Sequence, residues 1–143
     1  MTRRIVFNHP KMPEMLLNLA GVRCLPDDTN IATERDGVLL GGFVFTNYTG
    51  EGGSIIVHDA GQRHKWCTRE LLLLAFHYPF KQLKCRKIFA TVPADNTEAM
   101  KIDLRAGFTY HTTLEGMLPQ GDMIVLHMHV DDCKWLKYPL RGG

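Results

Sequence analysis

Three titratable side chains on or beside predicted strands could accept a proton during a reaction. His58 belongs to the residue type whose ordinary pKa, about 6.5, lies closest to neutrality. Asp59 follows it directly, and Glu34 ends an earlier predicted strand. We take His58, Asp59 and Glu34 as candidate catalytic residues. The alternative for each is an ordinary residue on the surface or at a strand end.

A run of basic and polar residues precedes a predicted helix that opens near residue 68. The run reads Arg63-His64-Lys65-Trp66-Cys67-Thr68. The first turn of a helix presents backbone N–H groups without helical partners and a partial positive charge, which together bind phosphate groups. Arg63 and Lys65 would add side-chain charge to such a site. The alternative is a solvated basic loop that ends in a threonine N-cap.

The elements that must position these residues follow from hydrophobic patterning and turn signals. The sequence predicts strands or hairpin arms at residues 4–7, 30–35, 38–48, 54–58, 87–92, 108–114 and 123–130, and helices at 13–20, 68–83 and 96–105. Asp36-Gly37 is a hairpin turn signal, and Pro79 should kink its helix. Gly41 and Gly42 indicate a bulge or a close backbone approach. This order predicts an α/β (α+β) fold with a mixed, mostly antiparallel sheet covered by helices.

Composition limits the class of protein. The chain has 143 residues, of which 45% are hydrophobic and 22% charged, values typical of a folded globular protein. We expect a single domain over residues 1–143. The formal net charge is +2 and the basic residues are spread along the chain, so we expect no nucleic-acid partner. Since no apolar run reaches the roughly 18 residues of a membrane span, we expect no membrane partner either.

Neither the cysteines nor the histidines indicate a metal site. The chain has four cysteines, Cys24, Cys67, Cys85 and Cys133, with no CxxC pair and no metal-ligand spacing. Without a secretory signal in the sequence, we expect reduced thiols in a cytoplasmic protein. His127 and His129 share one face of a predicted strand but lack a third ligand, so no metal is expected there.

One segment resembles a known family. The run Asn96-Thr-Glu-Ala99, followed by Arg105-Ala-Gly107-Phe108, is similar to the N-x-x-A segment, basic residue and Gly-Phe of the GNAT N-acyltransferases. Residues 76–83, Gly121-Asp122 and residues 132–136 look like the compact branch of ribosomal-protein N-terminal acetyltransferases and related phage-encoded proteins. The similarity is clearest over residues 38–130.

The resemblance implies a GNAT fold, with a twisted sheet and helices on both faces, and an acetyl group transferred from acetyl-CoA to a primary amine by direct attack. It implies that residues 63–68 bind the pyrophosphate of acetyl-CoA and that Asn96 lies near the pantetheine arm in addition to its N-cap role. A backbone N–H near Val57 to Asp59 would stabilise the oxyanion. The acceptor would be a protein N-terminus or a small molecule, and a homodimer is left open.

The sequence departs from the family pattern at three positions. Trp66 and Thr68 stand where glycines are usual, and we expect Trp66 to keep an ordinary backbone conformation, with its ring on the helix or over the cofactor. Asp103 stands where many members carry a tyrosine acid, and we expect a helix-surface charge there. Tyr48 or Tyr110 could replace that acid, or thiolate release needs none. These departures also favour two rivals: a GNAT-fold protein without catalysis, serving as a binding or virion-associated module, and an unrelated ligand-binding α+β domain.

Overall fold

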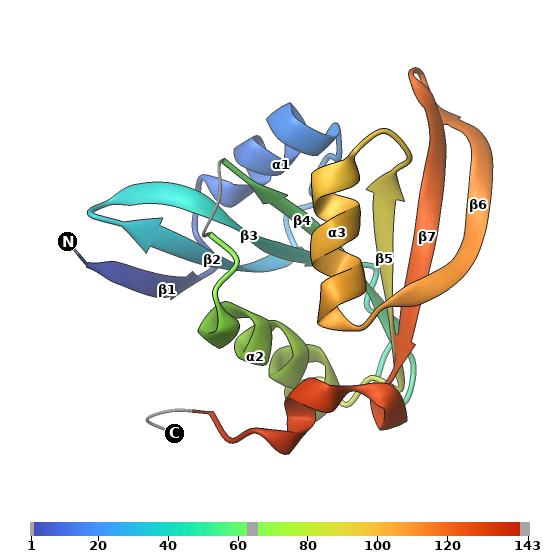
Figure 1. Ribbon diagram of the computed structural model, residues 1–143. Coiled ribbons are helices and arrows are strands. Elements are labelled where there is room, and N and C mark those ends of the chain that lie inside the picture. Colours follow the sequence, from blue (N-terminus) through green and yellow to red (C-terminus); the bar gives the residue numbers. More distant parts are fainter. Residues whose placement is uncertain (1, 63–65, 141–143) are drawn as a thin grey trace.

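The computed structural model describes residues 2–62 and 66–140, in which seven strands form one sheet (Figure 1). The strands are β1 (Arg3–Phe7), β2 (Thr29–Arg35), β3 (Val38–Thr46), β4 (Ser54–Gly61), β5 (Lys87–Pro93), β6 (Thr109–Leu118) and β7 (Gly121–His129), in the order β1-β2-β3-β4-β5-β7-β6. Only β4 and β5 pair in parallel. The predicted mixed, mostly antiparallel sheet is therefore confirmed.

The predicted hairpin around Asp36-Gly37 joins β2 to β3. Asp36 has φ 50° and Gly37 has φ 83°, so both turn residues adopt the positive φ that a two-residue hairpin of this type requires. A register shift in β2 between Thr33 and Glu34 lies opposite Leu39 to Gly41. A β-bulge thus accompanies the glycine pair of β3, as the sequence indicated.

Helices cover both faces of the sheet, as Figure 1 shows. Helix α1 (Met12–Ala20) buries Met12 and Leu16 against Val44 and Ala60 on one face. Helices α2 (Arg69–His77) and α3 (Thr97–Ala106) cover the opposite face. The core there contains the side chains Val57, Leu71, Ala75, Ile88, Ala90, Ala99 and Ala106. No helix within the described part of the chain is long and apolar enough to cross a membrane.

The helix that begins after Thr68 changes geometry where the sequence predicts a kink. α2 ends at His77, and one π-helical turn follows over Tyr78–Gln82. Pro79 has no backbone N–H and cannot continue the regular hydrogen-bond ladder. Tyr78 remains packed against Phe45 of β3, with ring centroids 5.1 Å apart, so the end of the helical segment stays attached to the sheet.

The two parallel strands diverge halfway along their length. β4 and β5 pair from Ser54 and Lys87 to Val57 and Ala90 and no further. Beyond this point β4 continues along β3 as far as Gly61, and β5 continues along β7 as far as Pro93. The strands therefore separate at their C-terminal ends, between α1 on one face and α2 with α3 on the other. This divergence positions the candidate site.

Candidate active site at the divergence of two parallel strands

His58 is the first residue of β4 beyond the last pair with β5, and it faces α1. Its Nδ1 lies 2.8 Å from Oγ1 of Thr91 on β5, and its Nε2 lies 3.1 Å from Oγ1 of Thr46 on β3. A neutral imidazole satisfies both contacts by donating with one nitrogen and accepting with the other. Burial lowers the pKa of His58 to about 4. His58 is therefore neutral at pH 7 and bridges the two diverging strands.

Asp59 faces the opposite side of the sheet, where its carboxyl group shares a hydrogen bond with Asp103 of α3. Asp59 is 7% exposed and Asp103 is 1% exposed. The expectation that Asp103 is a helix-surface charge was wrong: its position on α3 turns it toward β4 instead of solvent. Burial raises the pKa of Asp59 to about 7 and raises that of Asp103 as well, because two adjacent carboxylates cannot both ionise easily.

Cys67 lies near this carboxyl pair, and the charges of both carboxyl groups act on its thiol. Burial, with added repulsion from Asp59 and Asp103, raises the pKa of the Cys67 thiol to about 12. Such a thiol stays protonated at neutral pH and is a poor nucleophile. The three residues thus form one buried acidic cluster, contributed by β4, by α3 and by the segment leading to α2.

Thr68 caps the N-terminus of α2, as the sequence predicts. Its Oγ1 accepts a hydrogen bond of 3.2 Å from the N–H of Leu71, and its carbonyl accepts one of 3.0 Å from the N–H of Leu72. The N-terminal end of the helix carries a partial positive charge, which suits a phosphate group. The residues predicted to add charge to this site, Arg63, His64 and Lys65, lie outside the described residues.

Trp66 keeps an ordinary backbone conformation, since it is not among the residues with positive φ. Its ring lies on the sheet, with its centroid 5.4 Å from that of Phe43, and belongs to the core that Leu71 and Ala75 of α2 also share. A Cβ added to Gly41 would come within 2.8 Å of the indole, and one added to Gly61 would overlap it. Gly41 of β3 and Gly61 of β4 pair with each other and leave the space that the Trp66 ring fills. Trp66 is 5% exposed.

Glu34 is a buried carboxylate, but it lies away from His58. Its oxygens are 2.6 Å from Nε of Arg4 and 3.0 Å from Nε2 of His9. The hydrogen bond from Arg4 is the main cause that lowers the pKa of Glu34. His58 is aligned through Val44 with Asn30, four residues before Glu34, which puts Glu34 roughly 16 Å from His58 by standard strand dimensions. The structure therefore places His58 and Asp59 at the strand divergence, on opposite faces of the sheet, and places Glu34 outside it.

Asn96 caps α3, and its side chain accepts a 3.1 Å hydrogen bond from the N–H of Ala99. It also lines a cavity of about 480 Å³ between the end of α1 and the β5–α3 connection. The polar side chains of this cavity are Asn18, Asp95, Asn96 and Gln120. Among the described residues that line it, none is a lysine or an arginine. The cavity is thus suited to a polar or cationic ligand.

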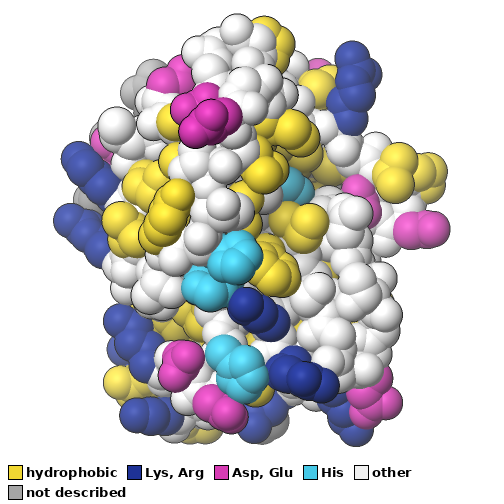
Figure 2. Space-filling view, turned by 90° about the vertical axis from the view of Figure 1, so that its right-hand side faces the viewer, with side chains coloured by type: hydrophobic (Ala, Val, Ile, Leu, Met, Phe, Trp, Pro, Cys, Tyr) yellow, Lys and Arg dark blue, Asp and Glu magenta, His cyan; other side chains and the backbone are white. Residues whose placement is uncertain are grey.

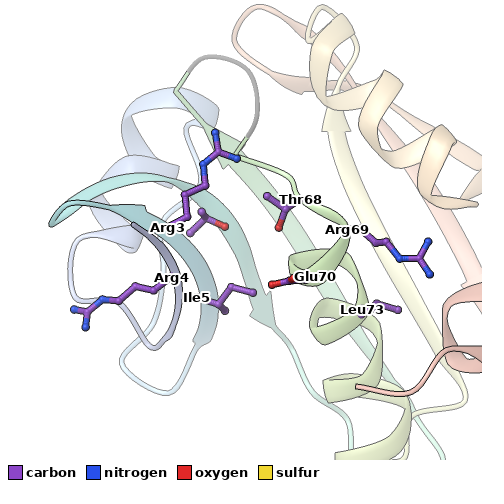
Figure 3. Close-up of a pocket in the computed structure, with 8 residues that line it drawn as sticks. Arg3, Arg4, Ile5, Thr68, Arg69, Glu70 and Leu73 are labelled. Carbon is purple, nitrogen blue, oxygen red and sulfur yellow. The ribbon is translucent and has the colours of Figure 1, made fainter. Parts of the chain in front are cut away.

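A second cavity, of about 610 Å³, lies between β1 and the first turns of α2 (Figure 3). Arg3, Arg4 and Arg69 are among its lining residues, and Ile5 and Leu73 add apolar surface. Figure 3 shows these residues on β1 and on α2, so the cavity lies on the β1 side of the helix. Its arginines make it unsuited to a protonated amine.

The two tyrosines proposed as alternative acids are held by local contacts. The hydroxyl of Tyr48 donates a 2.8 Å hydrogen bond to the carbonyl of Leu83. The hydroxyl of Tyr110 is 2.7 Å from Oγ1 of Thr113 on the same strand. Both rings are exposed, Tyr48 at 45% and Tyr110 at 60%. Neither contact joins the tyrosines to His58 or to the carboxyl pair.

Histidine side chains gather beside basic residues on the β6–β7 side of the molecule (Figure 2). The rings of His111 and His127 are 4.5 Å apart, and Phe89 is 5.7 Å from His111. The ammonium of Lys87 lies 4.9 Å from the centre of the Phe89 ring. Within the described ranges, no group of three or more His, Cys, Asp or Glu side chains could hold a metal ion. This patch is an aromatic stack with a cation beside it.

Two functional neighbours were not identified from the sequence. Thr46 and Thr91 hold the imidazole of His58, yet each is a common strand residue with no distinguishing local signal. Asp103 was identified but placed on the surface. A buried position could have been inferred from its helical spacing to Ala99 and Ala106, which are also buried.

No protein-family model and no curated protein sequence matches the chain. Among solved structures, a GNAT-family acetyltransferase from Bacillus anthracis matches at TM-score 0.58 and 19% identity, over 71% of this chain and 65% of that one, slightly less than two thirds of its length. A GNAT family acetyltransferase from Elizabethkingia anophelis, with acetyl-CoA bound, matches at TM-score 0.68 and 13% identity over 90% and 98% of the two chains.

The spermidine/spermine N-acetyltransferase SpeG from Vibrio cholerae, solved in mutant forms, matches at TM-score 0.71 and 16% identity over 95% and 98% of the two chains. At such identities the likeness concerns the fold. In this chain the fold is a mixed sheet with helices on both faces, and the strand divergence described above belongs to this sheet. The chain therefore has the fold of the GNAT acetyltransferases.

Proposed function

We propose that this protein is an acyl-CoA-dependent N-acyltransferase that transfers an acetyl group from acetyl-CoA to a primary amine by direct attack. The observation that carries the proposal is the divergence of β4 and β5 beyond Val57 and Ala90. It opens the sheet between a helix N-terminus that suits phosphate and a cavity that suits an amine. Acetyl-CoA and the acceptor would meet there from the two faces.

The donor side of the site is provided by β4, by the segment 66–68 and by α2. Since β4 loses its β5 partner after Val57, backbone N–H groups beyond this residue that face the gap are available to a thioester carbonyl. The N-terminus of α2, capped by Thr68, would receive the pyrophosphate, with Trp66 and Cys67 beside it. The Elizabethkingia anophelis protein, which has this fold, holds acetyl-CoA, and this supports the assignment.

The acceptor side is the cavity of about 480 Å³ between α1 and the β5–α3 connection. Asp95 supplies a negative charge, and Asn18 and Gln120 supply amide oxygens. The C-terminal end of α1 adds a partial negative charge and contains no basic residue in its last turn. An ammonium group would be attracted to this cavity, whereas the three arginines of the other cavity would repel it. SpeG acts on spermidine and spermine, which supports an amine acceptor, whether a protein N-terminus or a small molecule.

His58 is the proposed proton acceptor for the attacking amine. It faces the α1 side, it is neutral at pH 7, and its contacts with Thr46 and Thr91 fix its orientation. A base with a pKa of about 4 is weak for a free ammonium, but the amine nitrogen becomes far more acidic once it has attacked the carbonyl. Asp59 lies on the other face of the sheet, beside Asp103. Glu34 is paired with Arg4 and His9 outside the site.

The finer similarity to ribosomal-protein N-terminal acetyltransferases and phage-encoded proteins is not supported by the matched structures. The four free cysteines support a cytoplasmic location, and a homodimer stays open.

The proposal is tested by incubating the protein with acetyl-CoA and a panel of polyamines, small amines and peptides with free N-termini, while free thiol is measured. We expect thiol release that depends on one amine class. Binding of acetyl-CoA without turnover on any acceptor would favour the non-catalytic GNAT-fold module instead.

A further inference from the structure

We propose that Asp59 and Asp103 form a proton-sharing carboxyl pair that protonates the thiolate leaving the acyl donor. This inference rests on the proposed acyl transfer and assigns the proton donor of that reaction. It replaces the expectation that Asp103 is a surface charge. The reaction needs such a donor because a thiolate leaves more readily when its sulfur receives a proton.

The two carboxyl groups lie close enough together to share one proton. Asp59 extends from β4 and Asp103 from α3, and their side chains share a hydrogen bond. Two carboxyl groups can hydrogen-bond to each other only if one of them is protonated. Asp59 is 7% exposed and Asp103 1%, and Oδ2 of Asp103 has no hydrogen-bond partner among the described residues. The pair is thus largely removed from bulk water, and Asp59 keeps the small exposure through which a proton can be regained between turnovers.

The surroundings keep that proton in place at neutral pH. Burial raises the pKa of Asp59 to about 7, and burial together with the Asp59 charge and the hydrogen bond to Asp59 raises the pKa of Asp103. Among the described residues, Cys67, on the segment that leads to α2, is a titratable group on which the charges of both carboxyl groups act. With its pKa raised to about 12, the Cys67 thiol gives up a proton less readily than the carboxyl pair. Among these groups, the pair is the available acid.

The position of the pair matches the place where the thioester sulfur must lie. Asp59 is two residues beyond Val57, the last residue of β4 that pairs with β5. Cys67 and Thr68 adjoin the N-terminus of α2, and the charges of both carboxyl groups act on Cys67. A donor with its phosphates at α2 and its acetyl carbon in the strand divergence would pass its sulfur along this segment, beside the pair.

The proposed step balances as follows. The amine nitrogen forms a bond to the carbonyl carbon and releases one proton to the His58 side of the site. The carbon–sulfur bond then breaks, its electron pair goes to sulfur, and the proton of the carboxyl pair is transferred to that sulfur. The products are an amide and a free thiol. The pair is left with both carboxylates ionised and regains one proton from solvent, which has received the proton of the amine.

The test uses Asp103→Asn and Asp59→Asn, with Asp131→Asn as the matched control on an exposed aspartate. Each protein is assayed with acetyl-CoA and with an acetyl ester of an aromatic thiol, whose thiolate leaves without a proton. We expect kcat with acetyl-CoA to fall by about 10²- to 10⁴-fold in both pair variants, the scale of general acid catalysis. With the aromatic thioester, the kcat of both pair variants should approach that of the wild type. The kcat of the control variant should equal that of the wild type with both donors.

The pH profile of the wild type provides a measurement that needs no variant. With acetyl-CoA, kcat should decline at alkaline pH, where the pair loses its remaining proton from Asp103, whose pKa is raised by burial and by the Asp59 charge, and this decline should be absent with the aromatic thioester. Equal losses with both donors would overturn the acid role, as would Asn variants with full activity or a pH profile identical for the two donors. A wild type inactive with every amine would overturn the acyl-transfer proposal itself, together with this role.

Discussion

At the scale of single residues, two neighbours in the chain acquire opposite protonation behaviour. His58 and Asp59 are adjacent on β4, and strand geometry sends their side chains to opposite faces of the sheet. Burial favours the neutral form of each group, so the pKa of His58 falls to about 4 while that of Asp59 rises to about 7. A neutral imidazole and a carboxyl group whose pKa lies close to neutrality thus lie on the two sides of one strand.

This arrangement predicts how His58 affects the pH dependence of stability. Because its folded pKa lies below its unfolded value of about 6.5, the neutral buried His58 contributes stability that is lost as the pH falls from 6.5 through about 4. In urea unfolding, the wild type should lose roughly 3 kcal/mol relative to His58→Gln between pH 7 and pH 4. The carboxyl pair has the opposite sign but is present in both proteins, so it cancels in the comparison.

The control for this prediction is the exchange of the partly exposed His77 for glutamine, which should preserve the wild-type pH dependence. A free energy difference between the wild type and His58→Gln that is constant over this pH range would contradict the burial argument.

At the scale of elements, residues 66–68, which directly precede α2, are held by contacts at both of their ends. Trp66 packs onto a surface that lacks side chains because Gly41 and Gly61 face it. Two residues later Thr68 caps α2. Both contacts fix where the N-terminus of α2 points, and this direction decides whether a phosphate can meet it. Trp66 stands where the resemblance to the family implies a glycine. In this chain Gly41 of β3 and Gly61 of β4 leave room for its ring on the sheet.

Gly61→Ala should displace the indole of Trp66, because the added methyl group overlaps the ring. We expect a loss of about 1–3 kcal/mol in the free energy of unfolding, the usual range for overpacking. The measurement is a double-mutant cycle with Trp66→Val, in which Gly61→Ala should cost much less. If the alanine costs the same in both backgrounds, the clash with Trp66 is not the cause.

Thr68→Ala should remove the N-cap of α2 and lower the free energy of unfolding by about 1 kcal/mol. Since the first turn of α2 would then fray, acetyl-CoA affinity should fall as well. Thr68→Ser, which keeps the hydroxyl, is the control and should preserve both properties. Affinity that is unchanged in a destabilised Thr68→Ala protein would show that acetyl-CoA does not contact this end of the helix.

At the scale of the whole molecule, the sheet is continuous on one side of the divergence and open on the other. β4 is tied to the β1–β3 half and β5 to the β6–β7 half, and the two strands are joined by the pairs from Ser54 to Val57 and by the side-chain bridge from His58 to Thr91. A ligand seated in the gap would contact both halves. Such a ligand stabilises the folded state by an amount that grows with the logarithm of its concentration once this exceeds Kd.

Acetyl-CoA should therefore raise the melting temperature. At 100 times its Kd the stabilisation is about 2.7 kcal/mol, which corresponds to roughly 5–10 °C for a domain of this size. Differential scanning fluorimetry with acetyl-CoA, and with adenosine alone as the control, measures the shift. A melting temperature that does not change in millimolar acetyl-CoA would contradict the proposed donor site.

The sequence by itself determined the elements and the fold class, because these depend on residues close together in the chain. The Asp36-Gly37 turn, the kink at Pro79 and the caps Thr68 and Asn96 are all local features, and each was confirmed. The tertiary structure alone decided the environments of the titratable groups. Asp103 is buried because α3 packs where β4 brings Asp59, and Glu34 is paired because β1 and the start of α1 bring Arg4 and His9 beside it. The partners in these contacts are 25 to 44 positions apart in the chain, so helical spacing can indicate a buried face but not which partner meets it.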